Sequence, residues 1–117
     1  MDKEELRRRT KAFSLRVLKL IRALPRDVGA KAVAGQLVRA GMSAGANYRA
    51  SLRGRSRAEW ISKLNTCLEE SDESEFWMEL IIGDGMLPAK RVVPLLKEAG
   101  ELTAIFAAAI KTGRGEN

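Results

Sequence analysis

The chain has 117 residues, enough for one ordinary domain, and its 45% hydrophobic and 31% charged residues argue against a disordered chain. It has no histidine, which removes the usual general base and the commonest metal ligand, and its single cysteine excludes an intrachain disulfide. The net charge is +6, with a basic and an acidic half of the chain, which suggests a polyanion partner, self-association through opposite charges, or both.

The first predicted helix covers residues 3–24. Its apolar stripe recurs in alternating steps of four and three residues: Leu6, Thr10, Phe13, Val17, Leu20 and Leu24. The opposite face is basic, yet Leu15 lies within it. This leucine is either a harmless exposed residue or a contact between subunits. Pro25 ends the helix.

The second predicted helix covers residues 28–53, with Asp27 as its N-cap. Small residues are frequent in it, and each glycine inside a helix costs about 1 kcal/mol relative to alanine. We therefore expect a neighbouring helix to approach closely along this helix, whose small residues include Ala30, Ala34, Gly41, Ala44 and Gly45. Gly54 is expected to end the helix as its C′ residue.

The third predicted helix covers residues 57–82. Ser56 and Glu59 form a capping box at its start, so Glu59 is interpreted as a cap and not as a catalytic acid. The fourth helix covers residues 88–111. Pro88 suits its first turn, and Pro94 should either kink the helix or mark the start of its regular part.

Four amphipathic helices joined by short turns predict an all-α fold, an antiparallel up-down-up-down four-helix bundle, in a single domain of residues 1–117. No apolar run approaches the roughly 20 residues that span a bilayer. The N-terminus also lacks the apolar segment of a signal peptide. We therefore expect a cytoplasmic protein that does not contact membranes.

Charge is unevenly divided: residues 1–57 contain 15 Lys/Arg and 4 Asp/Glu, whereas residues 58–117 contain 6 and 11. In the predicted bundle, ten cations from all four helices gather at one end, which we call the basic pole. They are Arg7, Arg8, Arg9, Lys11, Arg49, Arg53, Arg55, Arg57, Lys111 and Arg114. Lysine and arginine bind phosphate backbones, so these ten are our candidate nucleic-acid-binding residues. The alternative is a solvated basic end that aids solubility.

No catalytic residue, metal site or cofactor is predicted. The carboxylates of residues 69–79 lack the histidines of a di-iron bundle, although Glu73 or Glu75 could turn inward to join a polar cluster with Ser43, Asn47 and Ser71. Cys67 lies on the apolar stripe and is interpreted as a core residue. Tyr48 fits packing better than stacking on a base.

Several spaced segments resemble the bacterial four-helix-bundle family that includes the 23S rRNA intervening-sequence proteins. The matching residues are Gln36, Leu37, Arg39, Ala40, Ser43, Asn47, Arg55, Ser56, Glu59, Trp60, Glu70, Glu73 and Trp77. Many members continue Asn-Ile-Ala-Glu-Gly after the matching asparagine, whereas this chain has Tyr48-Arg49-Ala50-Ser51 after Asn47.

The resemblance implies an antiparallel four-helix bundle that assembles as a homo-oligomer, commonly a ring-shaped homopentamer. It also implies no enzymatic activity. Related accessory proteins of diversity-generating retroelements bind a reverse transcriptase and RNA. We therefore expect a non-catalytic protein that binds structured RNA, or an RNA-bound protein such as a reverse transcriptase, through its basic pole. The alternative is a protein–protein adaptor or structural scaffold that does not bind nucleic acid directly.

Overall fold

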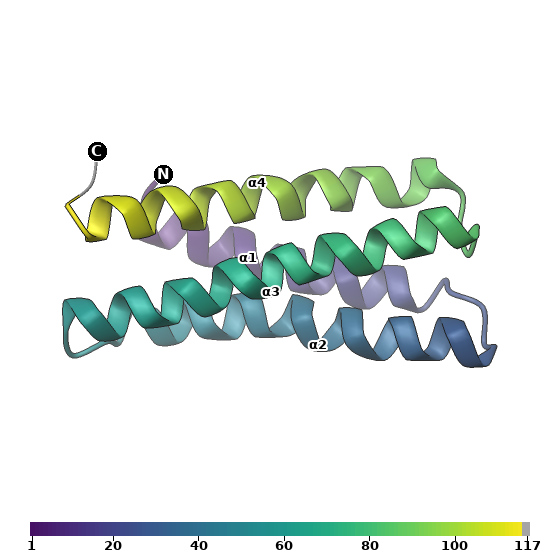
Figure 1. Cartoon of the computed structure of the whole chain (residues 1–117), viewed down its shortest axis with the longest axis horizontal. Helices are drawn as coiled ribbons and strands as arrows, with labels where there is room; N and C mark the ends of the chain where they lie inside the picture. The colour runs from purple at the N-terminus through teal and green to yellow at the C-terminus, as the bar shows by residue number, and fades with distance from the viewer. Residues whose placement is uncertain (116–117) are drawn as a thin grey trace.

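A computed structural model describes residues 1–115, which form four helices. They are α1 (Lys3–Ile21), α2 (Val28–Ser51), α3 (Arg57–Asp84) and α4 (Ala89–Gly113). Consecutive helices lie side by side and run in opposite directions (Figure 1), so the predicted antiparallel up-down-up-down bundle is confirmed. The bundle measures 45 × 23 × 20 Å. Residues 116–117, which the single-domain prediction includes, lie outside the described residues.

The core forms where the predicted apolar stripes meet. All six stripe residues of α1 and its C-terminal turn, from Leu6 to Leu24, are buried, because their spacing keeps them on one side of the helix. Phe13 and Phe106 are the largest fully buried side chains, and Leu37 and Leu64 complete the centre from α2 and α3. Burial of these apolar surfaces is the main source of the bundle's stability.

α1 and α2 approach closely at two glycines, as their sequence predicted. A Cβ atom at Gly41 would lie 2.8 Å from Val17 Cγ2, and one at Gly45 would lie 3.3 Å from the Thr10 carbonyl oxygen. Ser14 Oγ donates a hydrogen bond to the Gly41 carbonyl oxygen across this contact at 2.9 Å. The helix-forming cost of the two glycines is therefore offset by packing between the two backbones.

The predicted starts of α1, α2 and α3 are confirmed and that of α4 differs by one residue, whereas the C-terminal ends of all four helices differ by two or three residues. α1 stops at Ile21 because the chain tightens ahead of Pro25, which disfavours a helical conformation of the residue before it. Gly54 lies two residues beyond the C-cap Leu52 and is therefore not the C′ residue, so that prediction was wrong. It allows close passage of the chain, since a Cβ there would lie 3.4 Å from the Trp60 nitrogen. Gly85, with φ of 75°, ends α3 in the left-handed conformation.

The capping box is confirmed with one change. Ser56 Oγ accepts a hydrogen bond from the Glu59 amide at 3.1 Å, but the Glu59 carboxylate accepts from the Arg55 amide and not from that of Ser56. α4 begins with Pro88 as its N-cap and continues through Pro94 as one helix. Within residues 1–115, no helix is long and apolar enough to cross a membrane.

The α1–α2 contact gives a test of the packing. Gly41→Leu should destabilise the protein by about 1–3 kcal/mol, because the new side chain overlaps the buried Val17. Gly35→Ala is the matched control: nothing lies within 4 Å of its Cβ position, so it should stabilise the protein by about 0.5–1 kcal/mol. Urea denaturation measures both. Equal effects of the two substitutions would contradict the proposed close packing.

Candidate functional site: a basic groove between α1 and α2

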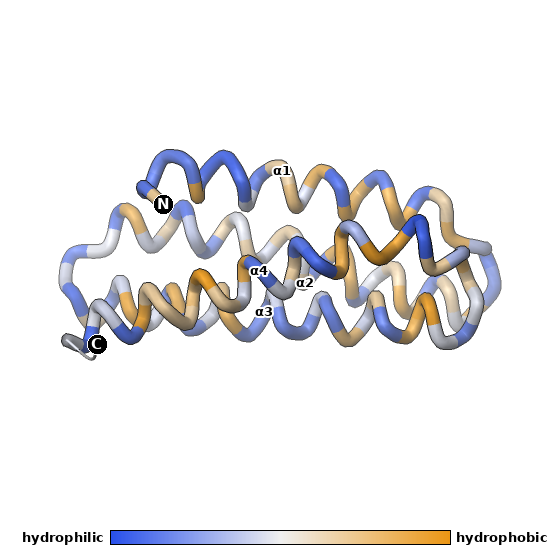
Figure 2. The backbone as a smooth tube through the Cα atoms, turned by 90° about the horizontal axis from the view of Figure 1, so that it is seen from above, coloured by the Kyte–Doolittle hydropathy of each residue, from blue (hydrophilic) through white to orange (hydrophobic). Residues whose placement is uncertain are grey.

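The helix ends that carry the ten predicted cations lie at the end of the bundle that holds both termini (Figure 1). The cations do not form one cluster there. α1 starts short of the tip made by the α2–α3 turn (Figure 2), so its basic residues lie along the side of the bundle. The structure divides the ten into a group in a groove, a group at the tip and Arg9, which pairs with carboxylates of α4.

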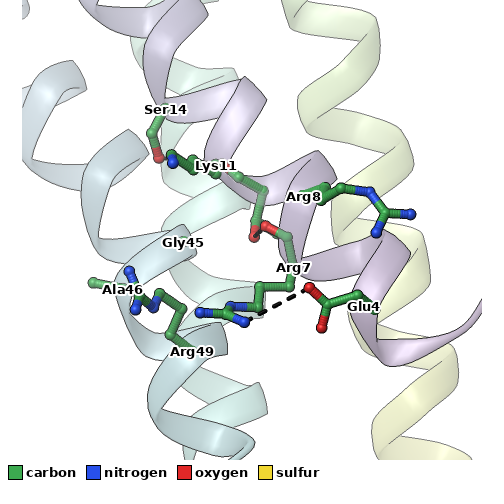
Figure 3. Close-up of a pocket in the computed structure, with 9 residues that line it drawn as sticks. Glu4, Arg7, Arg8, Lys11, Ser14, Gly45, Ala46 and Arg49 are labelled. Carbon is green, nitrogen blue, oxygen red and sulfur yellow. Dashed lines mark hydrogen bonds and ion pairs between the residues drawn. The ribbon is translucent and has the colours of Figure 1, made fainter.

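The first group lines a hollow of about 410 Å³ between α1 and α2. Arg7, Arg8 and Lys11 come from α1 and Arg49 comes from α2, while the hollow's other lining residues include Gly45 and Ala46. Arg7, Lys11 and Arg49 extend toward the space between the two helices, and Arg8 extends toward α4 (Figure 3). We call this hollow the α1–α2 groove.

One carboxylate borders the groove. Glu4 lies 3.6 Å from Arg7 Nη1, and both side chains are largely exposed, so the pair contributes little to stability. Because Glu4 is the only acid in the groove's lining, the cations there outnumber it by four to one. The groove can therefore accept an anionic group with only one local carboxylate to compete for the cations.

Arg9 is engaged within the bundle. Its guanidinium donates to both carboxylate oxygens of Glu98, each at 2.7 Å, and to Glu101 Oε1 at 2.8 Å. The hydrogen bond to Glu98 is the main cause of a raised pKa of Arg9. Sequence reasoning missed this pairing with α4. Arg9 therefore connects two helices and is less available than its neighbours to an outside ligand.

The tip group comprises Arg53, Arg55, Arg57, Lys111 and Arg114, all of them exposed. Arg57 lines a second hollow of about 410 Å³ together with Lys3 and Trp60. Gly113 allows α4 to pass the Trp60 ring, because a Cβ there would lie 2.4 Å from Cζ3. Tyr48, by contrast, is 3% exposed and packs against Phe106 with ring centroids 6.0 Å apart, so the predicted packing role is confirmed.

The acidic run on α3 forms a different kind of surface. Arg39 on α2 pairs with Glu70 and Glu73, and the Trp77 indole donates to Glu73 Oε2 at 3.1 Å. Phe76 contacts the edge of Trp77 with centroids 5.0 Å apart, yet Phe76 is itself 50% exposed. These residues hold α2 and α3 together and leave an aromatic ring on the outside.

The predicted polar cluster is partly wrong. Ser43 pairs with Asn47 on α2, where Asn47 Nδ2 donates to Ser43 Oγ at 2.9 Å. Glu75 turns toward α4 instead, where Thr103 Oγ1 lies 3.1 Å from Glu75 Oε2 and 2.9 Å from Ser71 Oγ. Sequence reasoning missed Thr103 because periodicity alone does not say which helices are neighbours.

Two side chains that could carry chemistry have pKa values set by burial. Burial raises the pKa of the Cys67 thiol to about 12, so at neutral pH it is protonated and a poor nucleophile. Burial also raises the pKa of Glu75, and the Thr103 hydrogen bond opposes that rise. No group of three or more His, Cys, Asp and Glu residues in the described part of the chain could hold a metal ion.

The fold and groove define a helical-bundle protein with a basic surface. Residues 3–108 match the family described as 23S rRNA-intervening sequence protein, and the chain belongs to this family. A crystal structure of a protein of unknown function, from the S23 ribosomal protein family of Bacteroides thetaiotaomicron, is similar. Its sequence is 28% identical, the match covers 90% of this chain and 97% of that one, and the TM-score is 0.84. No curated protein is matched.

Glu75 gives a prediction for pH dependence. Its pKa is raised in the folded state, so ionisation costs folding free energy, and the penalty is present at neutral pH and disappears as the pH falls below the ordinary carboxyl value of 4.5. Glu75→Gln should therefore stabilise the protein at pH 8, with a smaller gain at pH 4. Urea denaturation at both pH values measures this. Glu69→Gln, an exposed site on the same helix, is the control, and an equal pH trend in both variants would refute the assignment.

Proposed function

We propose that this protein is a non-catalytic, homo-oligomeric bundle of the cytoplasm that binds structured RNA, or an RNA-bound protein such as a reverse transcriptase. The observation that carries this proposal is the α1–α2 groove, where four cations surround a hollow with a single carboxylate. Phosphate groups suit such a surface because arginine binds them with two parallel hydrogen bonds. The family description, which refers to a 23S rRNA intervening sequence, supports an RNA-related role.

The side chains of the groove favour contacts with the RNA backbone. Its lining has no aromatic residue, and Tyr48 below it is buried. Proteins that read unpaired bases usually stack them on aromatic rings, whereas backbone and shape recognition needs mainly cations. We therefore expect strong dependence on salt and little dependence on base sequence.

The groove is tested by Arg7→Gln/Arg49→Gln. The variant should bind a fluorescein-labelled RNA hairpin about tenfold more weakly, and the slope of log affinity against log salt should fall by about 2, one for each lost phosphate contact. Fluorescence anisotropy between about 50 and 200 mM salt measures this. Lys90→Gln/Lys97→Gln removes the same charge from the exposed surface of α4 and should have a smaller effect. Equal losses of RNA affinity in both variants would show that net charge, and not the groove, determines binding.

Homo-oligomer formation is proposed through the exposed apolar side chains of α3. Phe76 is 50% and Leu80 38% exposed, and both lie on the side of α3 that faces away from the core. Exposed apolar residues held on a rigid surface commonly mark protein contacts. Leu15 on α1 is 58% exposed and remains the second candidate for a subunit contact.

Phe76→Ser/Leu80→Ser should lower the mass of the assembly measured by mass photometry. The thermal stability of each subunit should fall only modestly, because Phe76 is 50% and Leu80 38% exposed and neither belongs to the buried core. Leu15→Ser is the parallel test of the other apolar site. An unchanged mass in the α3 variant would exclude this surface as the contact between copies.

The same α3 surface favours a second candidate function, a protein–protein adaptor without direct RNA binding. Phe76 is surrounded along α3 by carboxylates, including Asp72, Glu73 and Glu79. A partner with a basic, partly apolar segment would fit this combination. If the serine variant keeps its mass and loses a nuclease-resistant protein partner, while the wild type shows no salt-dependent RNA binding, the adaptor function is correct.

A further inference from the structure

The basic residues of α1 continue well beyond the basic pole. Residues 6–26 contain eight Lys/Arg and no Asp/Glu. Within residues 1–115, ion pairs engage only two of these eight, Arg7 and Arg9. The other six are all exposed and extend to the far end of the bundle: Arg8, Lys11, Arg16, Lys19, Arg22 and Arg26.

Two further hollows lie along the same helix. One, of about 250 Å³, is lined by Arg16 and Lys19 of α1 and by Arg91 of α4. The other, of about 520 Å³, surrounds the α1–α2 connection and is lined by Arg22, Arg26 and Lys31. With the α1–α2 groove, three hollows along α1 each contain three or more cations and at most one carboxylate.

The hollows are too far apart to share one phosphate. At 1.5 Å per residue, Arg8 and Lys19 are separated by about 16 Å along the helix, and Arg8 and Arg22 by about 21 Å. A ligand that engages all three must therefore carry several anionic groups in a row. A nucleic-acid backbone, with a phosphate at every nucleotide, has this property.

We infer that a double-helical RNA stem lies lengthwise along α1, with its phosphates in the three basic hollows, which together we call the α1 track. This inference rests on the proposed RNA-binding function and replaces a contact at one pole with a contact along a whole helix. A stem fits better than a single strand because the only aromatic residue of α1, Phe13, is 1% exposed and cannot stack on a base.

The other conceivable occupant is the acidic surface of α3 in a second copy. Leu15 lies in the middle of the basic track, and Phe76 lies among carboxylates on α3. The two surfaces would therefore be complementary both in charge and in their apolar side chains. The stem is favoured because basic residues line concave hollows from one end of the track to the other, whereas the apolar part is one leucine. The test below separates the two.

The test is Arg16→Gln/Lys19→Gln, which changes the track far from the α1–α2 groove. Affinity for a fluorescein-labelled RNA hairpin with a long stem should fall about five- to tenfold, with a salt slope smaller by about 2. Affinity for a hairpin whose stem is too short to pass Lys11 should not change. Lys90→Gln/Lys97→Gln controls for net charge, and Leu15→Ser alters the same face without changing charge.

The outcomes are distinct. Wild-type protein that binds no hairpin refutes the RNA-binding function itself. If the wild type binds and Arg7→Gln/Arg49→Gln weakens binding while Arg16→Gln/Lys19→Gln does not, the function stands and the α1 track is wrong. Tighter wild-type binding to an unstructured strand of equal length also overturns the track. If Arg16→Gln/Lys19→Gln and Leu15→Ser both lower the mass of the assembly and leave hairpin affinity unchanged, the face is a contact between copies.

Discussion

The close contact between α1 and α2 at Gly41 and Gly45 determines the shape of the functional surface. Because neither glycine has a side chain, α1 packs against the α2 backbone, and Ser14 fixes this position through its hydrogen bond to the Gly41 carbonyl. The same approach brings Arg7 and Lys11 to the edge of a groove that Arg49 borders from the other side. A larger residue at Gly45 would fill the groove floor. Packing and charge are thus set by the same two positions.

Charge is separated across the bundle and is not cancelled inside it. α1 has seven Lys/Arg and two Asp/Glu, whereas α3 has two and eight. Both helices pack against α2 and α4, so they lie diagonally across the bundle from each other. Within residues 1–115, only Arg9 and Arg39 connect basic and acidic residues of different helices. Since the positive and negative helices face opposite sides, each side presents a field of one sign to solvent. A charged partner that is attracted to one side is repelled by the other, so the charge distribution orients the partner as well as attracting it.

The sequence was sufficient to predict the four helices, their directions and their core, because apolar periodicity and helix caps are local signals. It could not predict where each cation points. Arg8 and Arg9 are neighbours in sequence but differ by about 100° around the helix, so Arg8 is exposed and Arg9 reaches Glu98. The Glu75–Thr103 contact was missed for a similar reason, since it depends on which helices are adjacent. The sequence also did not indicate that Arg16, Lys19 and Arg91 lie together, because they line a hollow formed by two different helices.

The residues that carry the family resemblance are mostly structural. Arg39 joins α2 to Glu70 and Glu73 of α3. Within α3 Trp77 donates to Glu73, on α2 Asn47 binds Ser43, and Ser56 caps α3. Membership of the family therefore predicts the fold of this chain better than it predicts the ligand. The position that departs from the family pattern is more informative about this chain. Arg49 stands where many members have alanine, and Ala50 stands where they have glutamate, so the α1–α2 groove gains one cation and the chain loses one nearby acid. The change at Arg49 does not improve packing, since Arg49 is exposed. Repulsion among Arg7, Lys11 and Arg49 instead opposes folding slightly, and an anionic ligand in the groove would offset it.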